Sequence, residues 1–155
     1  MESVKPRESL TQYAHSLVKP YAYRGAIVVD ATAGNGLDTL FLSQCVGPLG
    51  YVYAVDLQEA AIQATQARMR SYYETCAAAC MGERPARMLY HVANHAIILD
   101  LVRPEHQASL SAVMFNLGYL PSGDKSIITQ SAYTLKAISN LVSLLTRPAC
   151  ISVLA

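Results

Sequence analysis

Two acidic residues and two glycines are the first residues along the chain whose spacing could hold a ligand. Asp30 ends a short apolar run, Gly34 and Gly36 follow closely, and Asp56 ends the next apolar run. Glycine adopts positive φ readily and lets a ligand approach the backbone. A helix that begins after such a turn presents unpaired N–H groups and a positive dipole end. The spacing therefore predicts a cofactor site between two strand ends.

The residues around these glycines separate two cofactor classes. A dinucleotide fingerprint reads G-x-G-x-x-G, and its third glycine would fall at Thr39. Asp30 would repel a pyrophosphate, but it could attract the ammonium group of a methionine moiety. Asp56 could accept hydrogen bonds from ribose hydroxyls in either class. The pattern favours S-adenosylmethionine (SAM) over a dinucleotide, and an ordinary strand-to-helix turn is the alternative without a ligand.

A second motif, Asn-Leu-Gly-Tyr-Leu-Pro at 116–121, could position a methyl acceptor. It is similar to the Asn-Pro-Pro-Tyr motif of methyltransferases that act on amino groups. The side-chain oxygen of Asn116 could accept the N–H hydrogens of an amine, and Tyr119 could stack on a nucleobase. An aliphatic amine must lose a proton before attack, and Asp124 could accept it. The alternative is a turn with a structural aromatic residue and a solvated acid.

Strands and helices alternate along the chain, and this order must position both motifs. The alternation predicts a parallel sheet covered by helices on both faces, where ligands bind at the carboxyl ends of the strands. The last helix is expected to carry its apolar residues on one stripe, as a helix packed on the sheet would, and Pro104 is expected to close the short helix or turn before it. Strands are expected at 26–30, 51–57, 88–92, 112–116 and 151–154, helices at 9–18, 37–46, 59–80 and 129–145, and a short helix or turn at 97–102. The expected stripe consists of Ala132, Leu135, Ile138, Leu141, Val142 and Leu145.

Composition limits the class of protein. The 155 residues fit a single domain spanning 1–155, and 52% hydrophobic with 15% charged residues excludes a disordered chain. A net charge of +1 does not require a nucleic acid or membrane surface as partner. The four cysteines form no C-x-x-C pair, which indicates packing cysteines rather than a metal site. Without a membrane-length apolar stretch or a signal peptide, we expect a cytoplasmic protein that spans no membrane.

Three longer stretches resemble one family. They are D-A-T-A-G-N-G-L-D-T-L-F-L at 30–42, V-D-L-Q at 55–58 and F-N-L-G-Y-L-P-S-G-D-K at 115–125. They are similar to the "putative rRNA methylase" family of class I SAM-dependent methyltransferases. Its better-defined members methylate the amino group of 5-aminomethyl-2-thiouridine at the wobble position of tRNA. The resemblance implies an α/β, Rossmann-like three-layer sandwich with a mainly parallel sheet, a homodimer, and tRNA bound through its anticodon region.

The resemblance also implies roles for single residues. Gln58 would join Asp56 at the ribose and adenine, Asn94 and His95 would lie beside the adenine, and Thr129 fits the family pattern. The residues expected to contact SAM are Asp30, Thr32, Gly34, Asn35, Gly36, Asp38, Thr39, Asp56, Gln58, Asn94, His95 and Asn116. The expected catalytic residues are Asn116, Tyr119 and Asp124. No metal is expected.

The chain departs from the family pattern at two places. Leu37 stands where the family often has histidine, and the chain ends at Ala155, before a further C-terminal hairpin of the family. Without that hairpin, 151–154 is expected to be an exposed apolar edge strand. Two alternatives remain open: a SAM enzyme that acts on rRNA or a small amine, and a SAM-binding module without activity. Basic residues near the first helix, among them Lys19 and Arg24, could contact phosphates, although solvated surface is the default interpretation.

Overall fold

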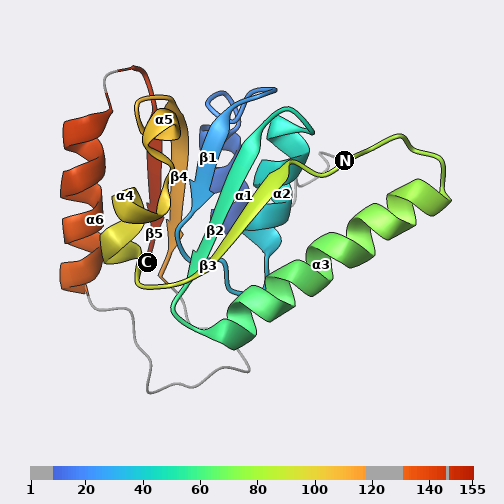
Figure 1. Cartoon of the computed structure of the whole chain (residues 1–155), viewed down its shortest axis with the longest axis horizontal. Coiled ribbons are helices and arrows are strands. Elements are labelled where there is room, and N and C mark those ends of the chain that lie inside the picture. Colours follow the sequence, from blue (N-terminus) through green and yellow to red (C-terminus); the bar gives the residue numbers. More distant parts are fainter. Residues whose placement is uncertain (1–8, 118–130, 146) are drawn as a thin grey trace, which may run out of the picture.

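A single parallel sheet organises the molecule (Figure 1). The computed structural model describes residues 9–117, 131–145 and 147–155. Within them, the strands are β1 (Ile27–Asp30), β2 (Tyr51–Asp56), β3 (Arg87–Val92), β4 (Leu110–Asn116) and β5 (Cys150–Leu154). Their order is β3-β2-β1-β4-β5, and every pair is parallel. The predicted α/β fold is confirmed, and the chain direction across the sheet reverses between β1 and β4, where such folds bind ligands.

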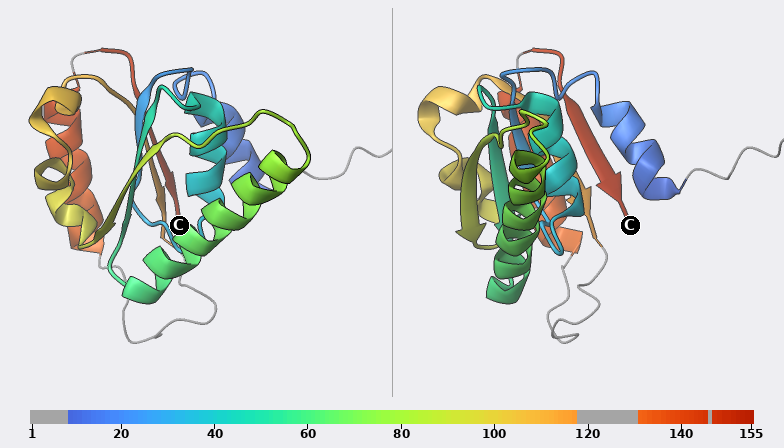
Figure 2. Two further views of the ribbon diagram at one scale, coloured as in Figure 1. Left: turned by 45° about the vertical axis from the view of Figure 1, so that its right-hand side comes forward. Right: turned by 90° about the vertical axis from the view of Figure 1, so that its right-hand side faces the viewer.

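Helices cover both faces of this sheet, as Figure 2 shows. One face carries α1 (Leu10–Val18), α2 (Leu37–Val46) and α3 (Glu59–Ala78). The other carries a short 3₁₀ turn, η1 (His95–Ile97), with α4 (Ile98–Leu101), α5 (Pro104–Gln107) and α6 (Ser131–Leu144). Because both faces are covered, the central strands are mainly apolar, and Val28, Val29 and Val55 are fully buried.

Local sequence signals explain where the first helices begin and end. In α1, Ser9 Oγ accepts from Gln12 N at 3.1 Å and Gln12 Oε1 accepts from Ser9 N at 2.9 Å, which forms a capping box. Helix α2 is terminated by Gly47, because its φ of 64° is incompatible with a right-handed helix, and Pro48 follows. These helices agree with the predicted ranges to within one residue at each end.

Two details of the predicted elements are wrong. Pro104 begins α5 instead of closing a helix, because the first helical position needs no backbone N–H. In α6, the predicted stripe residues Leu135 and Val142 are 64% and 62% exposed, whereas Thr134 and Ala137 are buried. Helix α6 has apolar residues on more than one face, and its packing against η1 and α4 selects the face that is buried.

Strand β5 is the edge strand on the α6 side of the described sheet. It pairs with β4, α1 packs beside it, and Val153 is 46% exposed, which agrees with the predicted apolar edge. The cysteines carry no disulfide: Cys76 is buried as expected for a packing residue, but Cys80 is exposed. Among the helices described, none is both long and apolar enough to cross a bilayer.

Candidate cofactor site

The carboxylate of Asp56 joins two strand ends at the carboxyl edge of the sheet. Its Oδ2 accepts from Gly34 N, in the loop after β1, and its Oδ1 accepts from Gln58 N, at the start of α3, each at 2.9 Å. Gly34 has a φ of +52°, and a Cβ added there would have no atom nearer than 3.8 Å. A carboxylate has about four acceptor positions, so Asp56 keeps some for a ligand hydroxyl.

Helix α3 holds the same loop from the other side. Thr65 Oγ1 donates to the carbonyl of Gly34 at 3.2 Å, and Arg68 Nε donates to the carbonyl of Asn35 at 2.5 Å. Gly36, with a φ of +78°, packs so tightly that an added Cβ would lie 2.9 Å from Thr65 Cα. Gly36 is therefore required by packing, whereas Gly34 leaves the loop surface open.

Thr65 and Arg68 were not predicted from the sequence as site residues. They lie one turn apart on the helix that follows Asp56, which is the only signal the chain gives for them. That spacing does not show which face of α3 meets the loop. Their importance follows from the register between α3 and the β1 end, which is a tertiary property.

Asp30 lies behind the loop rather than at its surface. Its side chain is fully buried, Oδ2 accepts from Thr39 Oγ1 at 2.5 Å, and Oδ1 accepts from Thr32 N at 3.2 Å. Burial, with the nearby charge of Asp38, raises the pKa of Asp30 to about 7. In this arrangement the Asp30 carboxyl group fixes the conformation of the loop through these two hydrogen bonds. The loop backbone would lie between this carboxyl group and the ammonium group of a bound ligand, which Asp30 was expected to attract.

Asp38 ties the first turn of α2 to α1. Asp38 as a whole is 5% exposed, and its Oδ1 lies 2.6 Å from His15 Nε2. The His15 ring stacks on Phe41, with ring centroids 3.9 Å apart. His15 therefore anchors the helix that begins after the loop 30–36.

Thr32 connects the loop to the end of β4, where the second motif begins. Thr32 Oγ1 accepts from Asn116 N at 2.7 Å, and Ala31 N donates to the carbonyl of Met114 at 2.8 Å. The Asn116 side chain is half-buried. Three other predicted residues of this region, Tyr119, Asp124 and Thr129, lie outside the described residues.

Asn94 and His95 follow β3 and make contacts within the protein. Asn94 Oδ1 accepts from Ala96 N at 2.9 Å and caps η1. His95 is 7% exposed, its Nε2 lies 3.1 Å from Thr134 Oγ1 on α6, and its ring meets Phe115 edge-on. Burial lowers the pKa of His95, although the Asp56 charge opposes this, so the ring is neutral at neutral pH. His95 joins η1 to α6, and the Asp56 carboxylate is near enough to affect its titration.

The structure gathers most of the predicted cofactor residues at one edge of the sheet. Hydrogen bonds between several of these residues connect the ends of β1 and β2 and the ends of β1 and β4. The set consists of Asp30, Thr32, Gly34, Asn35, Gly36, Asp38, Thr39, Asp56, Gln58 and Asn116. Among the described residues, no group of three or more His, Cys, Asp or Glu side chains is placed to hold a metal.

Comparison with known proteins identifies relatives of this chain. The chain is 39% identical over 137 residues to the chloroplastic tRNA (mnm(5)s(2)U34)-methyltransferase of Arabidopsis thaliana. That match covers 85% of the chain and 47% of the relative, so the chain spans about half the length of the curated relative.

Solved structures show the same fold. A putative rRNA methylase from Clostridium thermocellum is 34% identical, with a TM-score of 0.77 over 96% of this chain and 72% of that one. A putative methyltransferase from Streptococcus mutans, in complex with SAH, is 29% identical, with a TM-score of 0.73 over 97% of this chain and 73% of that one. The family model described as "Putative rRNA methylase" matches residues 52–155. The chain belongs to the putative rRNA methylase family.

Proposed function

We propose that the chain binds SAM between the loop 30–36 and Asp56, and that it transfers the methyl group to an amino group. The observation that carries this proposal is the Asp56 carboxylate, fixed at 2.9 Å by two backbone N–H groups beside a glycine loop with an open surface. Such a carboxylate is prearranged to accept ribose hydroxyls. The S. mutans relative was solved in complex with SAH, which supports the same ligand class.

The residues present fit this cofactor. Gly34 leaves room at the loop surface, and the first turn of α2 offers N–H groups and a positive dipole end to a carboxylate. Asp56 would accept from the ribose, with Gln58 beside it. When bound, SAM supplies an electrophilic methyl group on a sulfonium centre. The protein residues that would act on the methyl acceptor lie at the end of β4.

Asn116 is the described residue best placed to orient an acceptor amine. It ends β4 next to the loop, and its backbone N is already fixed by Thr32 Oγ1 at 2.7 Å. Its side-chain oxygen would accept an N–H hydrogen of the amine and direct the nitrogen lone pair. We extend the proposal to Tyr119 for base stacking and Asp124 for proton removal, as expected from the sequence.

The acceptor we propose is the aminomethyl group of a modified wobble uridine in tRNA. The name of the Arabidopsis relative, a tRNA (mnm(5)s(2)U34)-methyltransferase, supports this substrate class. The homodimer, the anticodon contact and the cytoplasmic location belong to the same proposal. Light scattering checks the dimer, and nuclease footprinting of bound tRNA checks the anticodon contact.

Calorimetric titration of SAM tests the cofactor half of the proposal. Asp56→Ala should weaken SAM binding by roughly 30- to 100-fold, the value of one or two hydrogen bonds to a charged group. Asp100→Ala, which removes an exposed carboxylate on α4, is the matched control and should leave the affinity unchanged. Equal SAM affinity of the Asp56→Ala variant and the wild type would contradict the assignment.

Methyl transfer to tRNA tests the acceptor half. Transfer RNA carrying the 5-aminomethyl group, rRNA fragments and small aliphatic amines are each incubated with the chain and SAM, and nucleosides are identified by mass spectrometry. We expect the tRNA uridine to gain one methyl group, and Asn116→Ala to lower the rate by about 100-fold. Methylation of rRNA or of a free amine alone would replace the tRNA assignment by the corresponding alternative.

A further inference from the structure

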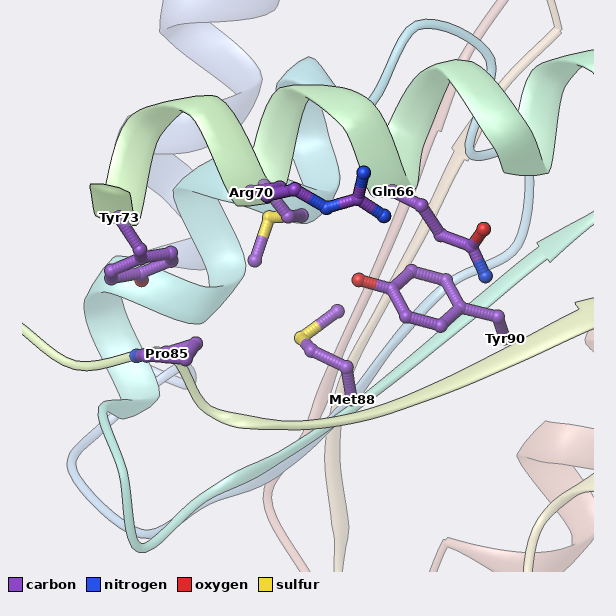
Figure 3. A pocket seen from close by; sticks show the side chains of 7 residues that line it. Gln66, Arg70, Tyr73, Pro85, Met88 and Tyr90 are labelled. Atoms are coloured by element: carbon purple, nitrogen blue, oxygen red, sulfur yellow. The ribbon is translucent and has the colours of Figure 1, made fainter. Parts of the chain in front are cut away.

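A hollow opens between α3 and the edge strand β3 (Figure 3). Its volume is about 410 Å³, within the range typical of small-molecule sites. We name it the α3–β3 hollow. It is lined by Gln66, Met69, Arg70 and Tyr73 from α3, and by Pro85, Met88 and Tyr90 from β3 and the segment before it. None of these residues belongs to the cofactor site described above.

The floor of the α3–β3 hollow is apolar and held in place. Met69 is 4% exposed and Tyr73 is 9% exposed. The Tyr73 hydroxyl lies 2.9 Å from Ser43 Oγ, which also accepts from Ala86 N at 3.0 Å, so the position of the ring is fixed. Met88 lies opposite on β3. Methionine sulfur makes favourable contacts with aromatic rings, so this floor suits a flat ring system.

The rim of the hollow carries polar groups that are unpaired among the described residues. Gln66 and Arg70 lie one turn apart on α3, and Figure 3 shows the Tyr90 hydroxyl directed to the same side as the Arg70 guanidinium. Within the described residues, these three side chains form no hydrogen bond or ion pair. No lining residue is acidic, so Arg70 makes the hollow positive.

Tyr90 supplies a donor beside this cation. Burial raises the pKa of Tyr90, and the positive charge of Arg70 opposes the rise. The phenol is therefore protonated at neutral pH and can donate to an anion. An apolar ligand would leave Arg70 unused, and an inorganic anion alone would leave the floor uncovered.

We propose that the α3–β3 hollow binds a nucleotide, with the base on the Met69 and Met88 floor and the phosphate on Arg70 and the Tyr90 hydroxyl. Gln66 can donate to and accept from a base edge, because its amide offers both groups. Tyr90 also packs against the cluster of Ala33, Ala54 and Ile62, so one wall of the hollow is in contact with a residue of the loop 30–36. The nucleotide is either one residue of an RNA strand or a free nucleotide. The inference is independent of methyl transfer, and an RNA ligand would extend the proposed function.

Methionine methyl NMR on the full chain locates the ligand directly. The chain has five methionines, and those at 69 and 88 line the hollow while Met81 and Met114 lie elsewhere. The methyl-labelled protein is titrated with AMP, UMP, ribose 5-phosphate, adenosine and a short RNA stem-loop. We expect the Met69 and Met88 signals to move with nucleotides or RNA, and those of Met81 and Met114 to stay.

Charge-matched variants test the contacts. Arg70→Met should weaken nucleotide or RNA binding by about tenfold, whereas Arg103→Met removes an exposed arginine on the other sheet face and should change nothing. Tyr90→Phe should weaken binding about threefold through loss of one hydroxyl. SAM affinity, measured in parallel, should be the same in all three variants, which separates this proposal from the cofactor assignment.

Each outcome of these experiments either supports or overturns the proposal. Shifts with AMP or UMP identify a free nucleotide site, and shifts with the stem-loop alone identify an RNA residue; both support the proposal. Unmoved Met69 and Met88 signals, equal affinity of Arg70→Met and the wild type, or equal binding of ribose 5-phosphate and AMP would each overturn it. Signals that change with protein concentration and not with nucleotide would assign the hollow to a second copy of the chain instead.

Discussion

Helix α3 forms part of two very different regions, the cofactor loop 30–36 and the α3–β3 hollow. Toward the loop, Thr65 and Arg68 donate to backbone carbonyls, and the Asp56 carboxylate accepts from backbone N–H groups. Toward β3, Arg70 and Tyr90 have no hydrogen-bonding partner within the described part of the chain. One region uses its polar groups to fix its own backbone, and the other leaves them available.

This difference teaches how each region would recognise a ligand. A loop whose polar groups are already paired is rigid, so it loses little conformational entropy when it binds a ligand. Such a loop also tolerates few substitutions. The hollow presents side chains on a helix and a strand, so single changes should alter binding and spare the fold. The predictions below test that contrast by stability measurements, in order of decreasing effect.

The largest effect is expected from the pH dependence of Asp30. Its pKa is raised to about 7 by burial, so its contribution to stability is full below pH ~4 and is lost as pH rises through about 7. Asp30→Asn cannot ionise there. The free energy of unfolding of the wild type relative to this variant should fall by on the order of 4 kcal/mol between pH 4 and 8.

Urea denaturation across that pH range checks the Asp30 prediction. The buried His95 and His106 have lowered pKa values, so they cost stability as pH falls below about 6.5, the opposite direction. Because both proteins contain them, their effect cancels in the difference. A wild-type-minus-variant difference that stays constant with pH would show that the Asp30 carboxyl group is not held in a dry environment.

A methyl group at Gly36 should destabilise the protein by about 3 kcal/mol. Its positive φ strains any other residue, and the added Cβ would lie 2.9 Å from Thr65 Cα on α3. Gly82→Ala is the matched control, because Gly82 has a φ of +70° but no atom within 4 Å of an added Cβ, so about 1 kcal/mol is expected. Thermal unfolding gives both values, and equal losses would mean that the loop does not press on α3.

Loss of the His15 contact should cost about 1 to 2 kcal/mol. His15→Phe keeps a ring to stack on Phe41 but leaves the carboxylate of Asp38, a residue 5% exposed, without its partner at 2.6 Å. Combining it with Asp38→Asn should recover part of the loss, because the unpaired charge is then removed. Chemical denaturation of the two single variants and the double variant measures this coupling, and additive losses would show that the pair is not linked.

The smallest effect is expected in the hollow. Arg70→Met should change the free energy of unfolding by no more than about 0.5 kcal/mol, since Arg70 is exposed and makes no hydrogen bond or ion pair with the described residues. The same denaturation series measures it. A loss as large as that of Gly36→Ala would remove the contrast between the two regions, because Arg70 would then be part of the folded framework.

The gathering of the expected site residues at one edge of the sheet could be predicted from the sequence, while their binding of SAM belongs to the proposal. Glycines with positive φ and acids at strand ends are local signals, so Gly34, Gly36 and Asp56 were found from spacing alone. The alternation of elements was sufficient to predict the parallel sheet. The burial of Asp30 behind the loop was not predicted, because it depends on the hydrogen bond that Thr39 Oγ1 donates from α2 to the Asp30 carboxyl group.

Other features depend on tertiary contacts that no spacing reveals. The face of α6 that is buried is chosen by η1 and α4, so Leu135 was assigned to the core although it is exposed. The α3–β3 hollow arises from the distance between a helix and an edge strand. Its residues Met69 and Met88 read as ordinary core positions in the sequence, and only the structure places Arg70 and Tyr90 beside them.

Selective glycine NMR with SAH tests the central claim most directly. Labelling glycine nitrogen together with the carbonyl carbon of alanine, asparagine or methionine isolates the amides of Gly34, Gly36 and Gly82, since each dipeptide, Ala-Gly, Asn-Gly and Met-Gly, occurs once in the chain. We predict that SAH shifts the Gly34 and Gly36 amides and leaves Gly82 in place. Unshifted Gly34 and Gly36 amides at saturating SAH would contradict the assignment of the loop 30–36 as the cofactor site.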